Sequence, residues 1–334
     1  MAKIEDVAQV AGVSTSTVSR ALTRPELVSP QTRARILQIA NQLDYHPNKL
    51  ARSLRTQQNH LLGLIVTDIL APFHATLAKG VQDAAEKHGY GVFLFNTDEE
   101  PEREARYLRE LQGHLPEGLL IVPTAKTKEN LQSVRNLTVV ELDRTSGTPG
   151  VYGVLVENVG GSRRAVEHLI ELGHRRIGMI AGPQNGTTAK ERLEGYQQAL
   201  LGAGIPSDPA LIAYGNHKED GGKWAARELL SLPKRQRPTA LFAGNSEMAA
   251  GTVLAIREAG LKIPTDVSLV CFDDTRWAQL MEPALTVVAQ PAYDLGYVGC
   301  ETLISVLRRS TTLKSNTLRL ETELIVRGST AAPR

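Results

Sequence analysis

The hydrophobic pattern of the chain changes at about residue 60. Before that point apolar residues recur at helical spacing. Between Ile4 and Ala11 they stand at i, i+3, i+4 and i+7, which predicts an amphipathic helix over residues 3–11. From Leu61 onward short apolar runs alternate with helical patterns, which is typical of parallel α/β units. We therefore expect an α/β protein, with a small all-α domain ahead of a larger doubly wound parallel-sheet domain.

Two more helices are predicted in the first segment. Gly12 ends the first helix, and Ser14 or Thr15 is placed to cap a second helix that runs to about Leu22. Two short helices joined by a turn with glycine make a helix-turn-helix. A cap, a proline in the first turn and an apolar stripe predict a third helix, at Ser29, Pro30, Ile36, Ile39, Ala40 and Leu43.

The predicted second helix is rich in short hydroxyl side chains, which are poor interior helix residues because they compete for nearby backbone groups. In a helix-turn-helix the second helix enters the major groove of DNA, where short hydroxyls can approach bases and phosphates closely. An ordinary helical hairpin with a serine-rich cap is the alternative. We expect base contacts from Thr15, Ser16 and Arg20, and phosphate contacts or capping from Ser14, Thr17 and Ser19.

Charge is uneven along the chain. The net charge is +2, but residues 1–56 hold eight Lys and Arg against four acids, a net +4, which leaves −2 for the remainder. A basic segment on a near-neutral body is typical of a module that binds a polyanion. A solvated charged face would give the same count.

A short basic helix is predicted after the third helix. Pro47 ends the third helix and Asn48 is a possible cap for one or two further turns. Such a short helix is expected to form only against a partner or on DNA. Its leucines, flanked by positive charge, suit a wedge in the minor groove, although a solvated linker would have the same composition. The expected DNA contacts in this segment are Asn48, Leu54 and Arg55.

The larger domain is predicted to carry a binding site at the carboxyl ends of its strands, where ligands bind in doubly wound sheets. Predicted strands cover 61–66, 91–95, 118–122, 138–143, 176–182, 210–215, 239–245 and 267–274, with clear helices at 78–88 and 163–172. The strand ends carry Asp68, Asp143, Asn245, Asp273 and Asp274. Carboxylates and amides suit the hydroxyls of a sugar or the edge of a purine. Asp68 and Asn245 could instead cap the helices that follow them.

Composition limits the classes of function. With 42% hydrophobic and 22% charged residues the chain is ordinary globular protein. It has no apolar run of about 18 residues and no signal pattern, so we expect a cytoplasmic protein without membrane contact. Two cysteines, Cys271 and Cys300, provide neither a disulfide framework nor a metal cluster, and we expect both to be buried.

We expect no enzyme activity, no metal and no cofactor. The chain has no G-x-S-x-G elbow, no P-loop, no G-x-G-x-x-G after its first strand, and no His/Cys cluster with metal spacing. Asp273 and Asp274 are adjacent in a strand, so their side chains point to opposite faces and make a poor acid/base pair. A solute-binding transport component would need export and would not carry a basic helix-turn-helix.

The first segment resembles a known family. IEDVAQVAGVSTSTVSRAL, VSPQTRARI and LDYHPNKLARSLRT are similar to the headpiece and hinge helix of the LacI/GalR family of bacterial transcription regulators, and the resemblance covers nearly the whole chain. It implies that Thr15 and Ser16 hold the base-reading positions, that Arg20 makes a contact at the end of the recognition helix, and that Leu54 intercalates at the operator centre.

The body resembles the periplasmic-binding-protein-like effector domain of the same family, through segments such as HLIELGHRRIGMIAGP, LFAGNSEMAAG and VSLVCFDDT. By that resemblance His217 falls where an aromatic wall is usual, and an exposed loop histidine is the alternative. The effector would be a sugar or sugar acid first, since Arg192 and nearby Lys190 leave room for an acid, and a nucleobase or nucleoside second. The expected effector contacts are Asp68, Phe73, His74, Asp143, Thr188, Arg192, His217, Asn245 and Asp273.

The expected domains are a helix-turn-helix headpiece (1–46), a hinge helix and linker (47–60), and an effector-binding and dimerisation domain (61–334). Lobe one of that domain would comprise 61–157 and 290–318, and lobe two 158–289 and 319–330, with three crossovers as a hinge. The chain has no terminal leucine heptads, so we expect a homodimer on a palindromic operator. The effector would act through its differential affinity for two lobe geometries, and induction or corepression stays open.

Overall fold

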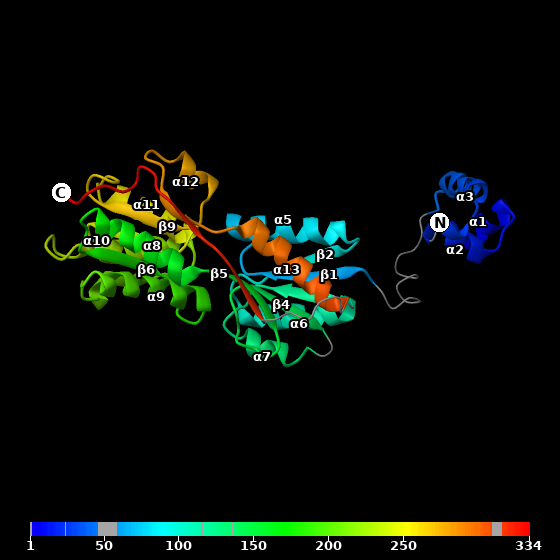
Figure 1. The fold of residues 1–334 in the computed structure, drawn as a ribbon, viewed down its shortest axis with the longest axis horizontal. Helices are drawn as coiled ribbons and strands as arrows, with labels where there is room; N and C mark the ends of the chain where they lie inside the picture. Colours follow the sequence, from blue (N-terminus) through cyan, green and yellow to red (C-terminus); the bar gives the residue numbers. More distant parts are fainter. Residues whose placement is uncertain (1, 24, 46–58, 115, 135–136, 309–315) are drawn as a thin grey trace. The chain divides into compact units, whose positions relative to one another are not determined.

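The computed structural model describes residues 2–23, 25–45, 59–114, 116–134, 137–308 and 316–334. The chain divides into two compact units, Met1–Asn59 and His60–Arg334 (Figure 1). Asn48, Leu54 and Arg55, which we expect to contact DNA, lie outside the described residues.

The first unit contains the three predicted helices. They are α1 (Ile4–Ala11), α2 (Thr15–Thr23) and α3 (Pro30–Gln42), with a 3₁₀ turn η1 (Pro25–Leu27) between the last two. Gly12 ends α1 in the left-handed region, at φ 61°, where a residue without Cβ is favoured. Ser29 caps α3 by accepting a hydrogen bond from the Thr32 N–H at 3.3 Å. The three helices pack around one small apolar core, formed by Val7, Ala8, Ala11, Val18, Ala21, Ile36, Ile39 and Ala40.

The second unit contains two six-stranded sheets, one in each lobe. The sheet of lobe one has the order β11-β5-β4-β3-β1-β2 and is parallel throughout. The sheet of lobe two has the order β12-β10-β9-β8-β6-β7, and only the β10–β12 pair is antiparallel. Their strands are β1 (Leu61–Val66), β2 (Gly91–Asn96), β3 (Gly118–Ile121), β4 (Thr138–Asp143), β5 (Tyr152–Val156) and β11 (Thr317–Leu320), and then β6 (Ile177–Ala181), β7 (Ile212–Tyr214), β8 (Ala240–Ala243), β9 (Ser268–Phe272), β10 (Thr286–Ala289) and β12 (Glu323–Ile325).

Helices cover both sheets, which is why the central strands are continuous apolar runs buried on both faces. Lobe one has α5 (Pro72–Lys87), α6 (Pro101–His114), α7 (Thr127–Leu131) and α13 (Ala292–Leu307). Lobe two has α8 (Asn158–Glu171), α9 (Thr187–Gly202), the 3₁₀ turn η2 (Pro209–Leu211), α10 (Glu219–Ser231), α11 (Ser246–Glu258) and α12 (Arg276–Leu280).

Helices α5 and α13 are far apart in sequence but lie side by side against the sheet of lobe one (Figure 1). Their backbones meet at glycines. A Cβ added to Gly80 would stand 2.1 Å from the Tyr293 carbonyl oxygen, and one added to Gly296 would stand 2.0 Å from that of Leu77. Only glycine permits this approach, so α13, although it is distant in sequence, is built into lobe one.

The chain crosses between the lobes after β5, after β10 and after β11. The expected boundary at 318/319 is wrong by two residues, because Arg319 and Leu320 still pair with Leu155 and Val156 in the sheet of lobe one. The third crossing therefore lies at residues 321–322.

Several elements differ from the sequence prediction. Strands β5, β10, β11 and β12 were not predicted, and β7 is shorter than residues 210–215 because η2 occupies 209–211. Helix α5 begins six residues before the predicted residue 78. Pro72 fits the first turn of a helix because its N–H would have no helical partner there.

Candidate functional site

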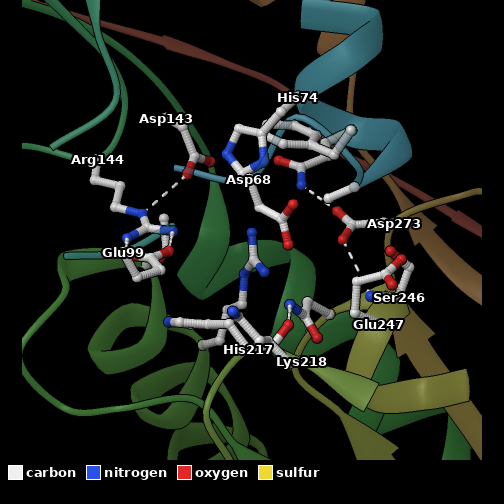
Figure 2. Close-up of a pocket in the computed structure, with 16 residues that line it drawn as sticks. Asp68, His74, Glu99, Asp143, Arg144, His217, Lys218, Ser246, Glu247 and Asp273 are labelled. Atoms are coloured by element: carbon white, nitrogen blue, oxygen red, sulfur yellow. Dashed lines mark hydrogen bonds and ion pairs between the residues drawn. The ribbon is translucent and has the colours of Figure 1, made fainter. Parts of the chain in front are cut away.

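One cleft in the second unit is lined by residues that follow strand ends in both lobes (Figure 2). All nine residues expected to contact an effector line it: Asp68, Phe73, His74, Asp143, Thr188, Arg192, His217, Asn245 and Asp273. Seven lining residues were not expected: Ala71, Glu99, Arg144, Lys218, Ser246, Glu247 and Gln290. Two of these had a signal in the sequence, because Glu99 follows β2 closely and Arg144 follows the end of β4 directly.

On the side of lobe one, Arg144 is tied to Glu99 by two hydrogen bonds, of 2.9 and 2.8 Å (Figure 2). Burial alone would raise the pKa of Glu99, but the charge and the hydrogen bonds of Arg144 outweigh it and lower that pKa to about 2. The two side chains therefore form a closed ion pair, and most of the positive charge of Arg144 is neutralised within the wall of the cleft.

Asp143 is buried beside this pair and lies in the left-handed region, at φ 65°. Its Oδ2 accepts from Arg144 Nε at 3.4 Å, while its Oδ1 has no hydrogen-bond partner in the described part of the chain. Burial raises the pKa of Asp143, although the charges of Arg144 and Arg192 oppose that shift. A buried acceptor without a donor is costly, so Oδ1 is a place where a ligand hydroxyl would be stabilising.

His74 is also buried in this wall, on α5. Its Nε2 lies 3.2 Å from Thr67 Oγ1, and its Nδ1 has no partner among the described residues. Burial, together with the positive charge of Arg144, lowers the pKa of His74 to about 4, so the imidazole is neutral near pH 7. The ring of Phe73 meets it edge-on, with centroids 5.2 Å apart. The neighbouring rings thus present both an apolar and a polar surface to the cleft.

Lobe two contributes Thr188 and Arg192, one turn apart on α9 and therefore on the same face of the helix. Arg192 is 6% exposed. Its Nε donates to Asn158 Oδ1 at 2.9 Å, its Nη1 donates to the Gly244 carbonyl at 2.6 Å, and its guanidinium lies 3.7 Å from the centre of the Phe272 ring. Within the described residues Nη2 makes no hydrogen bond and can donate to a ligand.

Asp273 lies at the end of β9, in the left-handed region at φ 79°. Its Oδ2 accepts from the Ser246 N–H at 3.2 Å, and its Oδ1 accepts from the side-chain amide of Gln290 (Figure 2). The neighbouring Asp274 does not line the cleft and pairs with Arg327 at 2.7 Å. The two carboxylates therefore point to different surroundings, as expected, but strand alternation is not the reason, because β9 ends at Phe272 and both residues lie beyond it.

The capping alternative is confirmed for Asn245. It is the N-cap of α11: its Oδ1 accepts from the Met248 N–H at 2.9 Å, while its Nδ2 donates to the His217 carbonyl at 2.9 Å. Both polar atoms thus already make a hydrogen bond, and the residue also lines the cleft.

The capping alternative is wrong for Asp68, because the N-cap of α5 is Ala71. Asp68 instead closes a turn, since its Oδ1 accepts from the Leu70 N–H at 3.0 Å. Its other carboxylate oxygen makes no hydrogen bond within the described residues. Asp68 is therefore held in place by its own turn while it lines the cleft.

His217 is half-buried, so the alternative of an exposed loop histidine is wrong. Its ring lies against Gly182, where an added Cβ would stand 2.4 Å from Cε1. Burial and the charge of Arg144 lower the pKa of His217 to about 3, so this ring is neutral as well. Lys190 is exposed and does not line the cleft, whereas Lys218 does.

The surface of the first unit that would face DNA lies on α2. Thr15, Ser16 and Arg20 are exposed, while Val18 on the opposite side of the helix is fully buried. Ser14 caps α2, because its Oγ accepts from the Thr17 N–H at 3.2 Å. Thr17 and Ser19 are half-buried. The assignment of base and phosphate contacts to these residues stays a prediction.

Over the described residues no helix is long and apolar enough to cross a bilayer. In the same part of the chain no group of three or more His, Cys, Asp and Glu side chains is arranged to hold a metal ion. Cys271 and Cys300 are free thiols and both are buried, as predicted. Burial raises the pKa of both thiols, that of Cys300 to about 12.

The neutral histidines of the cleft predict a loss of stability in acid. The unfolded chain binds a proton on His74 below pH 6.5, whereas the folded protein does so only near pH 4. As the pH is lowered from 6.5 to 4, the free energy of unfolding should decrease by up to about 1.4 kcal/mol per pH unit because of this residue. Urea unfolding at pH 7, 6 and 5 would measure it. A His74→Gln variant should flatten the slope, and an unchanged slope would contradict the burial argument.

Comparison with known proteins identifies the family of this chain. Residues 3–48 match the model described as bacterial regulatory proteins, lacI family, and residues 166–330 match that of the periplasmic binding protein-like domain. The ribose operon repressor of Escherichia coli (strain K12) is 35% identical over 332 residues, which cover 98% of this chain and 100% of the relative. This chain belongs to the LacI family.

Solved structures of LacI-family proteins share the fold. A lac repressor dimer bound to operator and the anti-inducer ONPF matches with a TM-score of 0.89 at 27% identity, covering 99% of each chain. The transcriptional regulator CelR in complex with cellobiose matches with a TM-score of 0.75 at 33% identity, covering 98% of this chain and 100% of that one. The LacI-family chain described here is accordingly a DNA-binding transcriptional repressor and not an enzyme.

Proposed function

We propose that this LacI-family repressor binds a palindromic operator as a homodimer and is controlled by a neutral, polyhydroxylated metabolite held in the cleft. Three polar atoms support the proposal of a polyhydroxylated ligand. Asp143 Oδ1, Gln290 Oε1 and His74 Nδ1 are buried, belong to residues that line the same cleft and have no partner among the described residues. The two carbonyl-type oxygens can only accept hydrogen bonds. Their natural partners are the hydroxyl groups of a sugar.

Charge favours a neutral sugar over a sugar acid. The cleft is lined by five carboxylates, Asp68, Glu99, Asp143, Glu247 and Asp273, and by three cations, Arg144, Arg192 and Lys218. Arg144 is already paired with Glu99, so its charge is not free to attract a ligand. A carboxylate or phosphate group on the ligand would meet net negative charge in a site of low dielectric, which is unfavourable. The relative named for ribose and the complex with cellobiose agree with a sugar ligand.

The operator half of the proposal comes from α2. Thr15, Ser16 and Arg20 are exposed on one helix and are free to reach base edges, while Ser14 caps the helix. The lac repressor bound to operator is a dimer, and a twofold dimer presents two such helices to the two halves of a palindrome. Operator binding would require the protein to be in the cytoplasm, where we expect it.

The test is selection from a pool of random duplex DNA at fixed salt with the purified chain, alone and with D-ribose, cellobiose, a sugar acid or cytidine. We expect a palindrome to be enriched and its affinity to change with a neutral sugar only. Enrichment no better than the salt-sensitive background would refute operator binding. A response to the sugar acid or to cytidine alone would refute the neutral-sugar ligand. The sign of the response distinguishes induction from corepression.

A further inference from the structure

Two consecutive residues of α9 make contacts in different directions. Arg192 extends into the cleft, and Glu191 extends toward the crossovers between the lobes, where Arg319 meets it. Arg319 belongs to β11 in the sheet of lobe one, whereas α9 belongs to lobe two. The ion pair between Glu191 and Arg319 therefore joins the two lobes, at 2.6 Å between Arg319 Nη2 and Glu191 Oε1.

Asn158, the first residue of α8, connects this pair to the cleft. Its Nδ2 donates to Glu191 Oε2 at 2.9 Å, and its Oδ1 accepts from Arg192 Nε at 2.9 Å. Arg319 Nη1 also donates to the same Glu191 oxygen, at 3.1 Å, and to the Val156 carbonyl at 2.9 Å. A continuous chain of hydrogen bonds thus runs from strand β11 of lobe one to the guanidinium in the cleft.

The donors and acceptors of these side chains fix the orientation of the Asn158 amide within the series of hydrogen bonds. Asn158 is fully buried, and an amide can face Arg192 usefully only with its oxygen, because the guanidinium has donors alone. Glu191 has acceptors alone, so it holds the nitrogen of the same amide on the other side. Loss of Glu191 from its place would remove the shorter of the two hydrogen bonds that hold the Asn158 Nδ2, leaving only the Val156 carbonyl at 3.4 Å, and would loosen the amide whose oxygen accepts from Arg192 Nε. Arg319 in turn keeps Glu191 oriented by a bidentate ion pair.

We propose that Asn158 is the positioning residue for Arg192 and that the Glu191–Arg319 pair makes this positioning depend on how the two lobes sit. Arg319 does not line the cleft, yet it sets the affinity for the effector. The role in effector binding rests on the proposed function, whereas the control of the Arg192 side chain does not. A rearrangement of the lobes that separates Arg319 from Glu191 releases Arg192, and a ligand on Arg192 favours the lobe arrangement in which the pair is intact.

The test compares three variants of the full chain at partly exposed arginines: Arg319→Met, Arg319→Lys and the control Arg163→Met. Arg163 pairs with Glu167 on the same helix of lobe two, at 3.6 Å, so its loss removes an ion pair without touching the hinge. Hydrogen exchange of the Arg192 Nε–H, followed by NMR without any ligand, should be faster in Arg319→Met and nearly unchanged in Arg319→Lys and Arg163→Met. Equal exchange in Arg319→Met and Arg163→Met would overturn the proposal, whether or not a sugar binds.

Affinity for D-ribose, or for whichever neutral sugar the selection identifies, gives a second readout. We expect Arg319→Met to weaken binding roughly three- to tenfold and Asn158→Leu by at least about tenfold, since a hydrogen bond to a charged group is at stake. In the Asn158→Leu background, Arg319→Met should have no further effect, because the connection is already broken. Independent, additive losses in the double variant would overturn the coupling. Faster exchange in Arg319→Met without any loss of affinity would support the control of the Arg192 side chain and overturn its role in effector binding.

Discussion

Replacing Ile36 by alanine should abolish operator binding and leave effector binding intact. Ile36 is fully buried at the centre of the only apolar core that the first unit has within the described residues. Truncation of a buried isoleucine to alanine costs about 2–5 kcal/mol. A three-helix unit of this size rarely holds more than about 3–5 kcal/mol of stability, so most of the variant headpiece should be unfolded. The second unit has its own cores and should remain folded.

The control lies one residue away. Leu37 is on the same helix but is 37% exposed, so Leu37→Ala makes the same kind of change without opening the core. Binding to the selected operator should fall by more than about 100-fold in Ile36→Ala and by less than threefold in Leu37→Ala. Sugar binding by calorimetry should be unchanged in both. Parallel loss of sugar binding in Ile36→Ala would contradict the division into two independent units.

Replacing Arg192 by methionine should make operator affinity insensitive to the effector. The guanidinium is the only buried cation that the described residues of lobe two place in the cleft, and it lies over the Phe272 ring. Methionine fills the space of the aliphatic stem, but it removes the donor for the ligand and the positive charge between Asp143 and Asp273. We expect effector affinity to fall at least about 100-fold, equivalent to about 2.7 kcal/mol.

Operator binding without effector should stay within a fewfold of the parent protein, because Arg192 belongs to the second unit only. Arg227→Met is a suitable control, since this exposed arginine pairs with Glu258 on the surface of lobe two. Titration of the operator complex with sugar would show a normal response in Arg227→Met and none in Arg192→Met. A normal response in Arg192→Met would show that the effector binds elsewhere.

Four of the nine cleft residues, Asp68, Asp143, Asn245 and Asp273, could be predicted from the strand pattern, because parallel strands are easy to recognise and their carboxyl ends meet at one edge of a sheet. Asp143 and Asp273 follow buried apolar runs, and that position alone directs attention to them. The family resemblance added the other five, which have no such signal: Phe73, His74, Thr188, Arg192 and His217. For Asn245 the sequence left two interpretations open, and the structure shows why: the residue caps α11 and lines the cleft at the same time.

What the sequence did not show depends on contacts between distant residues. Glu99 and Arg144 lie in two different loops, and each by itself resembles an ordinary surface charge. Strand β11 was missed because TLRL is mostly exposed and has no buried apolar run. Because Arg319 and Leu320 of β11 were assigned to lobe two, the expected lobe boundary was misplaced and Arg319 was not recognised as a contact between the lobes. Asn158 was missed because a buried amide at the start of a helix has no recognisable pattern until its partners are in place.

The close crossing of α5 and α13 at Gly80 and Gly296 has a consequence for biosynthesis. Helix α13 is complete only at Leu307, 220 residues after the end of α5 at Lys87 (307 − 87), and ribosomes add about 5–20 residues per second, so α5 waits roughly 11–44 seconds for its partner. During that time the surface around Leu77 is uncovered, and β5 is an open edge strand until β11 arrives. The nascent chain can complete lobe one only after Leu320 has been translated, and α5 and β5 are the segments on which chaperones would act.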